Sequence, residues 1–250
     1  MYRAAARPGQ AARPGDRLAR TGGGTYKPAV SEDACSMDYA DARRRMVDGQ
    51  LRPNKVTDPR LLEAMRDLPR ERFLPPHLRT RAYIDEDVPL PGGRAFMEPM
   101  VLARLVQLIA PRPGDRALVV GAGTGYGAAV LARMGAEVTA AEDDAALAAM
   151  AREAFADCLP PAAVRLVDGA PPEGGPFDAV LVEGEVPAVP DRVSALLAEG
   201  GRLSAVVGEG RRNGVAVLGR RLGGTFTVTP EFDCAVAALP AFAAPARFVF

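Results

Sequence analysis

Histidine is almost absent from this chain. Only one, His77, occurs in 250 residues, so a Ser-His-Asp triad, a multi-histidine metal site or a histidine proton relay would each have to include it. His77 directly follows Pro75 and Pro76, a context typical of a surface turn. The sequence therefore disfavours chemistry that depends on histidine.

Cysteine is also scarce. The three cysteines, Cys35, Cys158 and Cys234, are odd in number and widely separated. They offer neither a disulfide framework nor the paired spacing of a zinc site. We therefore predict no metal site, and a reducing, cytoplasmic location is the simplest interpretation.

Net charge and long apolar runs are lacking as well. Lys plus Arg and Asp plus Glu both total 31, so no overall field favours nucleic acid or a membrane surface as the partner. No apolar run approaches the roughly 20 residues that a membrane-spanning helix needs. With 48% hydrophobic and 25% charged residues, the composition is typical of a soluble globular protein. Nothing in it indicates an oligomeric state.

Residues 1–36 differ in composition from the rest of the chain. They are rich in Arg, Ala, Gly and Pro and contain almost no large aliphatic side chains. Such a segment buries too little apolar surface to offset its ordering entropy. It is expected to be disordered, or to be a non-native extension upstream of a true start at Met37. An arginine-rich RNA-binding arm is disfavoured because Asp16, Glu32 and Asp33 dilute its charge.

From Met37 to residue 112 the pattern is mainly helical. Three segments carry apolar residues at helical spacing, namely 38–51, 57–68 and a segment that begins at Pro99. Asp58 and Pro59 suit the N-cap and first position of the second helix. A long connection rich in Pro and Gly separates the second helix from the third. We expect a helical N-terminal extension ahead of the main sheet.

Residues 113–250 alternate between strand and helix patterns. Strands are expected at 116–120, 136–142, 163–168, 177–183 and 201–208, and helices at 125–134, 144–157 and 190–200. Such alternation predicts an α/β fold, doubly wound, with a mostly parallel sheet covered on both faces. Residues 214–232 instead predict two strands joined at Leu222-Gly223-Gly224, an antiparallel C-terminal hairpin.

A glycine-rich loop follows the first of these strands. It contains Gly121, Ala122, Gly123, Thr124 and Gly125, where the strand turns into a helix. Glycines there allow positive φ and let backbone amides approach a ligand. The next strand ends in Glu142, whose carboxylate is placed to accept both hydroxyls of a ribose. This combination predicts a nucleoside site at the carboxyl edge of the sheet.

The glycine spacing discriminates between nucleotide ligands. A dinucleotide fingerprint places its third glycine where this chain has Tyr126, and a bulky side chain there hinders the approach of a pyrophosphate. A nicotinamide-dependent oxidoreductase is disfavoured for that reason. The G-x-G-x-G pattern suits a single nucleoside with an amino-acid tail, S-adenosyl-L-methionine. Asp168 and Gly169, after the third strand, are placed to contact the adenine, although an ordinary Asp-Gly turn explains the pair nearly as well.

An extended set of motifs resembles the bacterial protein-L-isoaspartate O-methyltransferases. The likeness runs from Arg43 to Gly208 and is carried by "RRRMVDGQL", "LLEAMRDLPRERFLP", "AYIDEDVPLP", "EPMVLARLVQL", "GAGTGYGAAVLARMGAEVTAAE", "VDGAPPEGGPFDAVLVEG" and "LLAEGGRLSAVVG". The resemblance implies a Rossmann-like methyltransferase fold that uses S-adenosyl-L-methionine. Cofactor contacts would fall on the glycine loop, Glu142 and Asp168. The substrate would be protein or peptide carrying isoaspartyl residues, methylated on the free carboxylate.

Three departures from the family pattern bear on which substrate the resemblance implies. The family's Thr-Ile-Ser-Gln-Pro element is Ala95 to Pro99 here, with Met97 and Glu98 at the aligned catalytic positions and no hydroxyl. The acid that often precedes the loop is Val119. The Thr-Ala-Ala after the fourth strand is replaced by Glu183-Gly184-Glu185, which makes Glu183 a further candidate.

The departures leave alternatives open. Each of Glu98, Glu183 and Glu185 is equally well explained as a solvated side chain. If two of them face the cleft, a cationic or neutral acceptor is favoured over isoaspartate, because a glutamate there would repel a carboxylate. A methyltransferase with another acceptor and a cofactor-binding homologue that has lost isoaspartyl activity therefore both remain.

Overall fold

The computed structural model describes residues 38–172, 174–208 and 214–243. These residues all lie in one compact unit, Met37–Phe250. The expectation for residues 1–36 lies outside the described residues.

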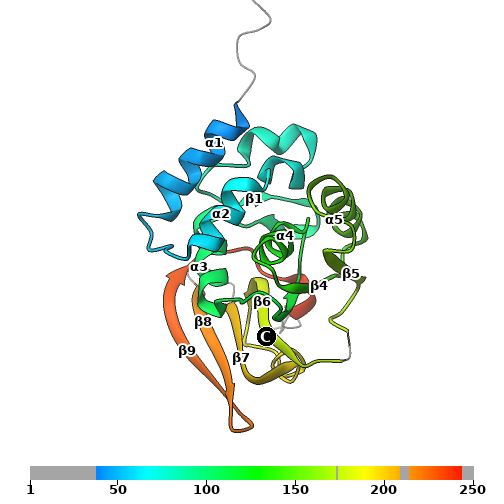
Figure 1. Ribbon diagram of the computed structural model, residues 1–250. Coiled ribbons are helices and arrows are strands. Elements are labelled where there is room, and N and C mark those ends of the chain that lie inside the picture. Colours follow the sequence, from blue (N-terminus) through cyan, green and yellow to red (C-terminus); the bar gives the residue numbers. More distant parts are fainter. Residues whose placement is uncertain (1–37, 173, 209–213, 244–250) are drawn as a thin grey trace, which may run out of the picture. The chain divides into compact units, whose positions relative to one another are not determined.

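A seven-stranded sheet forms the centre of this unit (Figure 1), with the strand order β5-β4-β3-β6-β7-β8-β9. Its strands are β3 Arg116–Val120, β4 Glu137–Glu142, β5 Val164–Asp168, β6 Phe177–Val186, β7 Leu197–Val207, β8 Gly214–Leu222 and β9 Thr225–Cys234. The first five strands of this order run parallel, and β8 and β9 are antiparallel. The predicted mostly parallel sheet with a C-terminal hairpin is confirmed.

The strand order reverses at β3, because β4 lies on one side of it and β6 on the other. In doubly wound sheets ligands bind at the carboxyl ends of the strands beside such a reversal. The topology therefore favours a ligand site formed by the loop after β3 and the ends of β4 and β6.

The two faces of the sheet are packed by different elements. Alternate residues of β3 point to opposite sides, with Ala117 and Val119 in one apolar cluster and Leu118 and Val120 in another. The first cluster is formed with α3 Pro99–Ile109, α4 Tyr126–Arg133 and α5 Ala145–Cys158. The second includes Val193 of the short helix α6 Asp191–Ser194 and Leu239 of the C-terminal segment.

The N-terminal extension is helical, as predicted, and packs into the first cluster (Figure 1). Its elements are α1 Tyr39–Met46, the π-helix η1 Val47–Leu51, α2 Pro59–Asp67, the 3-10 helices η2 Arg70–Phe73, η3 Pro76–Arg81 and η4 Pro91–Gly93, and the two-residue strands β1 Val88–Pro89 and β2 Ala95–Phe96. Asp58 caps α2, since its side chain accepts from the amide of Arg60 at 2.9 Å. His77 is exposed in η3. Among the described residues no helix is both long and apolar enough to span a membrane.

The predicted helix over 190–200 is wrong in its second half. Only Asp191–Ser194 is helical, and Leu197 already pairs with Phe177 of β6 as the first residue of β7. Gly200 adopts φ +76°, a conformation that an α-helix does not allow. The apolar spacing that suggested a helix is overridden by pairing with a neighbouring strand.

Strand β6 extends beyond the predicted end at Glu183, to Val186. Near that end Glu185 forms a parallel bridge with Ala238, so the C-terminal segment returns to the middle of the sheet. A single 3-10 turn, η5 Pro240–Phe242, follows the bridge. This return places residues 237–242 beside the loop after β3.

Candidate functional site

The loop from Gly121 to Gly125 joins β3 to α4 and carries positive φ angles at its three glycines. At Gly125, φ is +93° and an added Cβ would lie 2.5 Å from the Phe155 ring, so no side chain fits. At Gly123, φ is +57° and an added Cβ would meet only Arg94, at 3.9 Å. The middle of the loop therefore has open space over its backbone. Ala122 and Thr124 between them are buried, and the Thr124 hydroxyl has no hydrogen-bond partner.

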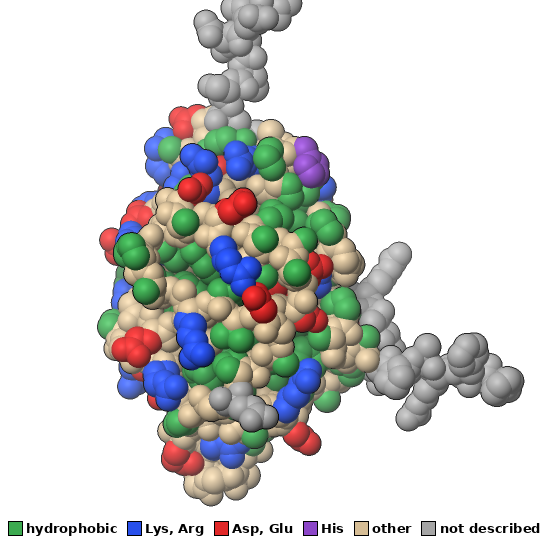
Figure 2. Space-filling view, turned by 90° about the vertical axis from the view of Figure 1, so that its right-hand side faces the viewer, with side chains coloured by type: hydrophobic (Ala, Val, Ile, Leu, Met, Phe, Trp, Pro, Cys, Tyr) green, Lys and Arg blue, Asp and Glu red, His purple; other side chains and the backbone are tan. Residues whose placement is uncertain are grey.

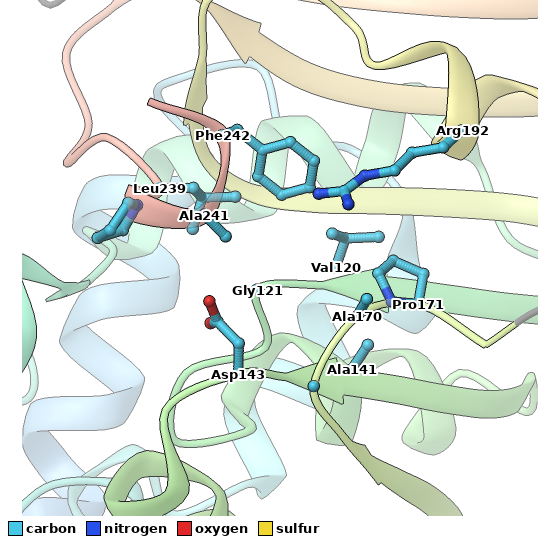
Figure 3. A pocket seen from close by; sticks show the side chains of 12 residues that line it. Val120, Gly121, Ala141, Asp143, Ala170, Pro171, Arg192, Leu239, Ala241 and Phe242 are labelled. Carbon is cyan, nitrogen blue, oxygen red and sulfur yellow. The ribbon is translucent and has the colours of Figure 1, made fainter. Parts of the chain in front are cut away.

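A cavity of about 170 Å³ lies against this loop (Figure 3). It is lined by Val120, Gly121, Ala141, Asp143, Gly169, Ala170, Pro171, Arg192, Leu239, Pro240, Ala241 and Phe242. The wall is mainly apolar, with Asp143 and Arg192 as its charged members. The ends of β3 and β4 and the residues after β3, β4 and β5 form one side, and Arg192 of α6 and the C-terminal segment form the rest. Size, apolar walls and position suit a nucleoside base.

Glu142 is buried at the end of β4 and already has four hydrogen bonds. Arg94 donates to it from Nη1 at 2.7 Å and from Nη2 at 3.1 Å. The amides of Gly123 and Asp144 donate at 2.5 and 2.9 Å. Arg94 also donates to the carbonyl of Gly121 at 2.8 Å. A ribose that binds Glu142 would therefore compete with Arg94.

The Asp168-Gly169 pair divides between two environments. Gly169 lines the cavity, and its amide donates to the Glu142 carbonyl at 2.7 Å. Asp168 is exposed, pairs with Arg152 of α5 at 2.5 Å, and is not part of the cavity wall. The carboxylate in the wall is instead Asp143.

A smaller pocket of about 10 Å³ has Arg94 in its wall. It is lined by Asp87, Arg94, Ala95, Met97, Glu183, Gly184, Val236 and Ala237. Two of the three predicted catalytic positions, Met97 and Glu183, are thus brought together. Glu98 is not in this wall. We call this pocket the acceptor pocket, because it contains the positions aligned with the family's acceptor region.

Glu183 projects from β6 toward the first turn of α4. Its Oε2 is buried without a hydrogen-bond partner and lies against Gly127. Burial raises the pKa of Glu183 to about 8, an effect that Arg94 and Arg70 oppose and Glu142 reinforces. At neutral pH the side chain is therefore mainly the neutral acid.

The other two glutamates have different surroundings. Glu98 is half-buried at the N-cap of α3, and its amide donates to Asp87 at 2.8 Å. Burial, with Asp85 and Asp87 nearby, raises the pKa of Glu98 to about 7. Glu185 is buried, and its carboxylate lies against Gly208, directly after β7, and Gly214, the first residue of β8. Glu185 therefore does not face the acceptor pocket.

Several residues of the site were not predicted from the sequence. Arg94 directly precedes the aligned Ala95, but no local pattern links it to Glu142, 48 positions later. Asp143 adjoins the predicted Glu142, and that adjacency was an available signal. Leu239 and Phe242 carry no motif.

Charged side chains of both signs lie on the surface. Figure 2 shows basic and acidic side chains mixed over the visible face, in line with the balanced composition. Within residues 38–172, 174–208 and 214–243, no three His, Cys, Asp or Glu side chains gather so that they could hold a metal ion.

Comparison with known sequences links the chain to one family. A family model described as Protein-L-isoaspartate(D-aspartate) O-methyltransferase matches residues 42–239. The chain is 44% identical to the protein-L-isoaspartate O-methyltransferase of Methylorubrum extorquens, over 68% of this chain and 76% of that protein. It is 40% identical to protein-L-isoaspartate O-methyltransferase 1 of Rhodopseudomonas palustris, over 74% and 76%.

Solved structures agree on the fold. A crystal structure from Plasmodium falciparum, of a protein described as a putative protein-L-isoaspartate O-methyltransferase in complex with S-adenosyl-L-homocysteine, matches with a TM-score of 0.67 and 22% identity. That match covers 79% of this chain and 97% of the other. A second structure, described as a protein-L-isoaspartate O-methyltransferase, has a TM-score of 0.68 at 24% identity, covering 80% and 67%.

Proposed function

The chain belongs to the protein-L-isoaspartate(D-aspartate) O-methyltransferase family, and on that premise we propose that it methylates the free carboxylate of isoaspartyl residues in proteins or peptides. The single observation that carries the proposal is the family match over residues 42–239. The open loop after β3 and the adjoining cavity support it from the structural side.

The residues present fit S-adenosyl-L-methionine as the methyl donor. The backbone of Gly123 is open to a ligand, since an added Cβ would meet only Arg94 at 3.9 Å. The hydroxyl of Thr124 is buried and unpartnered. We propose that Gly121, Ala122, Gly123, Thr124 and Gly125 hold the amino-acid part. In the same proposal Glu142 binds the ribose, and the cavity at Gly169 holds the base. The carboxylate in the wall of this cavity is that of Asp143 and not that of Asp168.

The chemistry of this transfer matches the residues available. The bound cofactor supplies a methyl group on a sulfonium cation. A carboxylate acceptor is already ionised at neutral pH, with a reference pKa of about 4, so no general base is required. The protein's task is to align the acceptor and to exclude water, which stabilises separated charges and so raises the barrier. Met97, in the wall of the acceptor pocket, is only 4% exposed, so little water reaches this side chain.

The proposal is tested with an isoaspartyl peptide and its aspartyl twin, which differ only in backbone connectivity. The purified full chain, given methyl-labelled cofactor, is expected to label the isoaspartyl peptide and not the aspartyl control. Equal labelling of both, or none, refutes isoaspartyl methylation. A cytoplasmic location, proposed on the cysteine content, is tested by cell fractionation.

A further inference from the structure

The acceptor pocket lacks the hydroxyls that the family pattern carries, at Ala95 and Met97. Its wall contains three polar side chains, Asp87, Arg94 and Glu183. Asp87 accepts from the amide of Glu98, and Arg94 is bound to Glu142. Only Glu183 has a buried side-chain oxygen without a hydrogen-bond partner. That oxygen, Oε2, lies against Gly127 of α4. The Glu183 carboxyl is therefore the polar group of this wall that is not fully hydrogen-bonded.

The surroundings of Glu183 determine its protonation state. Arg94, from the turn before β2, and Arg70, from η2, face it with positive charge, and Glu142, from β4, faces it with negative charge. Asp87 shares the pocket, and from α4 the neighbour is the backbone of Gly127. Burial is the largest influence and holds the pKa near 8, so the side chain carries a proton at neutral pH. A protonated carboxyl can donate a hydrogen bond, which a carboxylate cannot.

We propose, resting on the function proposed above, that the Glu183 carboxyl contacts the acceptor carboxylate and donates a hydrogen bond to it in place of the missing hydroxyls. Hydrogen bonds from a carboxyl to a carboxylate are charge-assisted and strong. The proton stays on Glu183 throughout. One acceptor oxygen receives the hydrogen bond while the other forms the new bond to the methyl carbon, and the electron pair of the broken carbon–sulfur bond stays on sulfur.

An ionised Glu183 would have a different use. As a general base it would remove a proton from an N–H or O–H acceptor, and the rate would then rise with pH up to its pKa. If protonated Glu183 instead donates to a carboxylate, the rate is expected to fall as the pH rises above the pKa of Glu183. The sign of the pH dependence therefore separates the two roles.

The experiment measures kcat/KM for the isoaspartyl peptide between pH 7 and pH 9, in the unaltered chain, Glu183→Gln and Glu98→Gln. A group with a pKa of about 8 is about nine-tenths protonated at the lower limit and about one-tenth at the upper. The unaltered chain should lose about tenfold, mainly through a higher KM. Glutamine donates at every pH, so the ratio of Glu183→Gln to the unaltered chain should rise about tenfold. Glu98→Gln should retain the fall, since Glu98 lies outside the pocket wall.

Each outcome decides. A flat or rising profile in the active, unaltered chain overturns the assignment of Glu183 and leaves the proposed function intact. A fall in kcat/KM with rising pH that persists in Glu183→Gln, or that disappears in Glu98→Gln, also overturns the assignment of Glu183. No transfer at any pH overturns the proposed function and this assignment with it. If Glu183→Gln fails to fold, a flat or rising profile in the unaltered chain still overturns the assignment, and loss of the fall in Glu98→Gln does so as well, so the proposal stays falsifiable.

Discussion

Replacing Arg94 with methionine is expected to change stability and cofactor affinity in opposite directions. The variant loses two hydrogen bonds to Glu142 and one to Gly121. Removing one partner of a buried ion pair costs ~3–5 kcal/mol. Glu142 keeps its backbone donors at Gly123 and Asp144, so the expected loss in the free energy of unfolding lies at the lower limit, about 3 kcal/mol.

The expected gain in affinity has a separate origin. In the free chain Arg94 occupies the carboxylate oxygens that we propose for the ribose hydroxyls. A hydrogen bond to a charged group contributes ~1.5–3 kcal/mol. When the ribose displaces Arg94 from Glu142, its own hydrogen bonds restore most, but not all, of this free energy. Relief of this competition should therefore contribute about 1 kcal/mol, which corresponds to a Kd roughly fivefold lower.

Urea denaturation measures the free energy of unfolding, and calorimetry with S-adenosylhomocysteine measures Kd. The matched control is Arg133→Met, which breaks the exposed pair of Arg133 with Asp67 at 2.6 Å. It should change stability by less than ~1 kcal/mol and leave Kd unaltered. A weaker affinity in Arg94→Met, with the control unchanged, would refute the competition. A stability loss no larger than the control's would refute the energetic role of the buried pair.

Three further predictions concern Glu183 and the loop. The raised pKa of Glu183, from 4.5 to about 8, means that its contribution to stability is complete below pH 4.5 and is lost as pH rises toward 8. Relative to Glu183→Gln, the free energy of unfolding of the unaltered chain should therefore fall by on the order of 4 kcal/mol across that range, as measured by urea denaturation. An equal pH dependence of the two proteins would contradict this. Gly125→Ala should lower stability by about 2–4 kcal/mol, because Cβ meets the Phe155 ring at positive φ; thermal unfolding measures it, and an unchanged Tm refutes it. Gly123→Val should abolish cofactor binding in calorimetry while the chain stays folded, and unaltered affinity counts against the loop.

Much of the fold could be predicted because local sequence determines it. The apolar run of β3, the glycines that follow and the periodicity of α4 are short-range signals, and each element lies within a residue or so of its predicted position. The predicted helix was wrong at residues 195–200, where strand pairing with β6 determines the conformation. Such pairing depends on residues about 20 positions away and leaves no local pattern.

The site was predicted only in part, for the same reason. The loop and Glu142 follow from their order along the chain. Arg94 was missed because an ion pair between distant residues has no signature in spacing. The raised pKa of Glu183 could not be predicted, because it depends on burial, which the residue type does not reveal.

The bridge between Glu185 and Ala238 has a consequence for the timing of assembly. Ribosomes make the chain from its amino end, so β3 and its loop emerge long before Leu239 and Phe242. Those two residues form part of the wall around the proposed base site. A nascent polypeptide that has not yet released residues 237–242 from the exit tunnel lacks part of that enclosure, so the proposed base site is completed only when this segment has emerged and paired with β6.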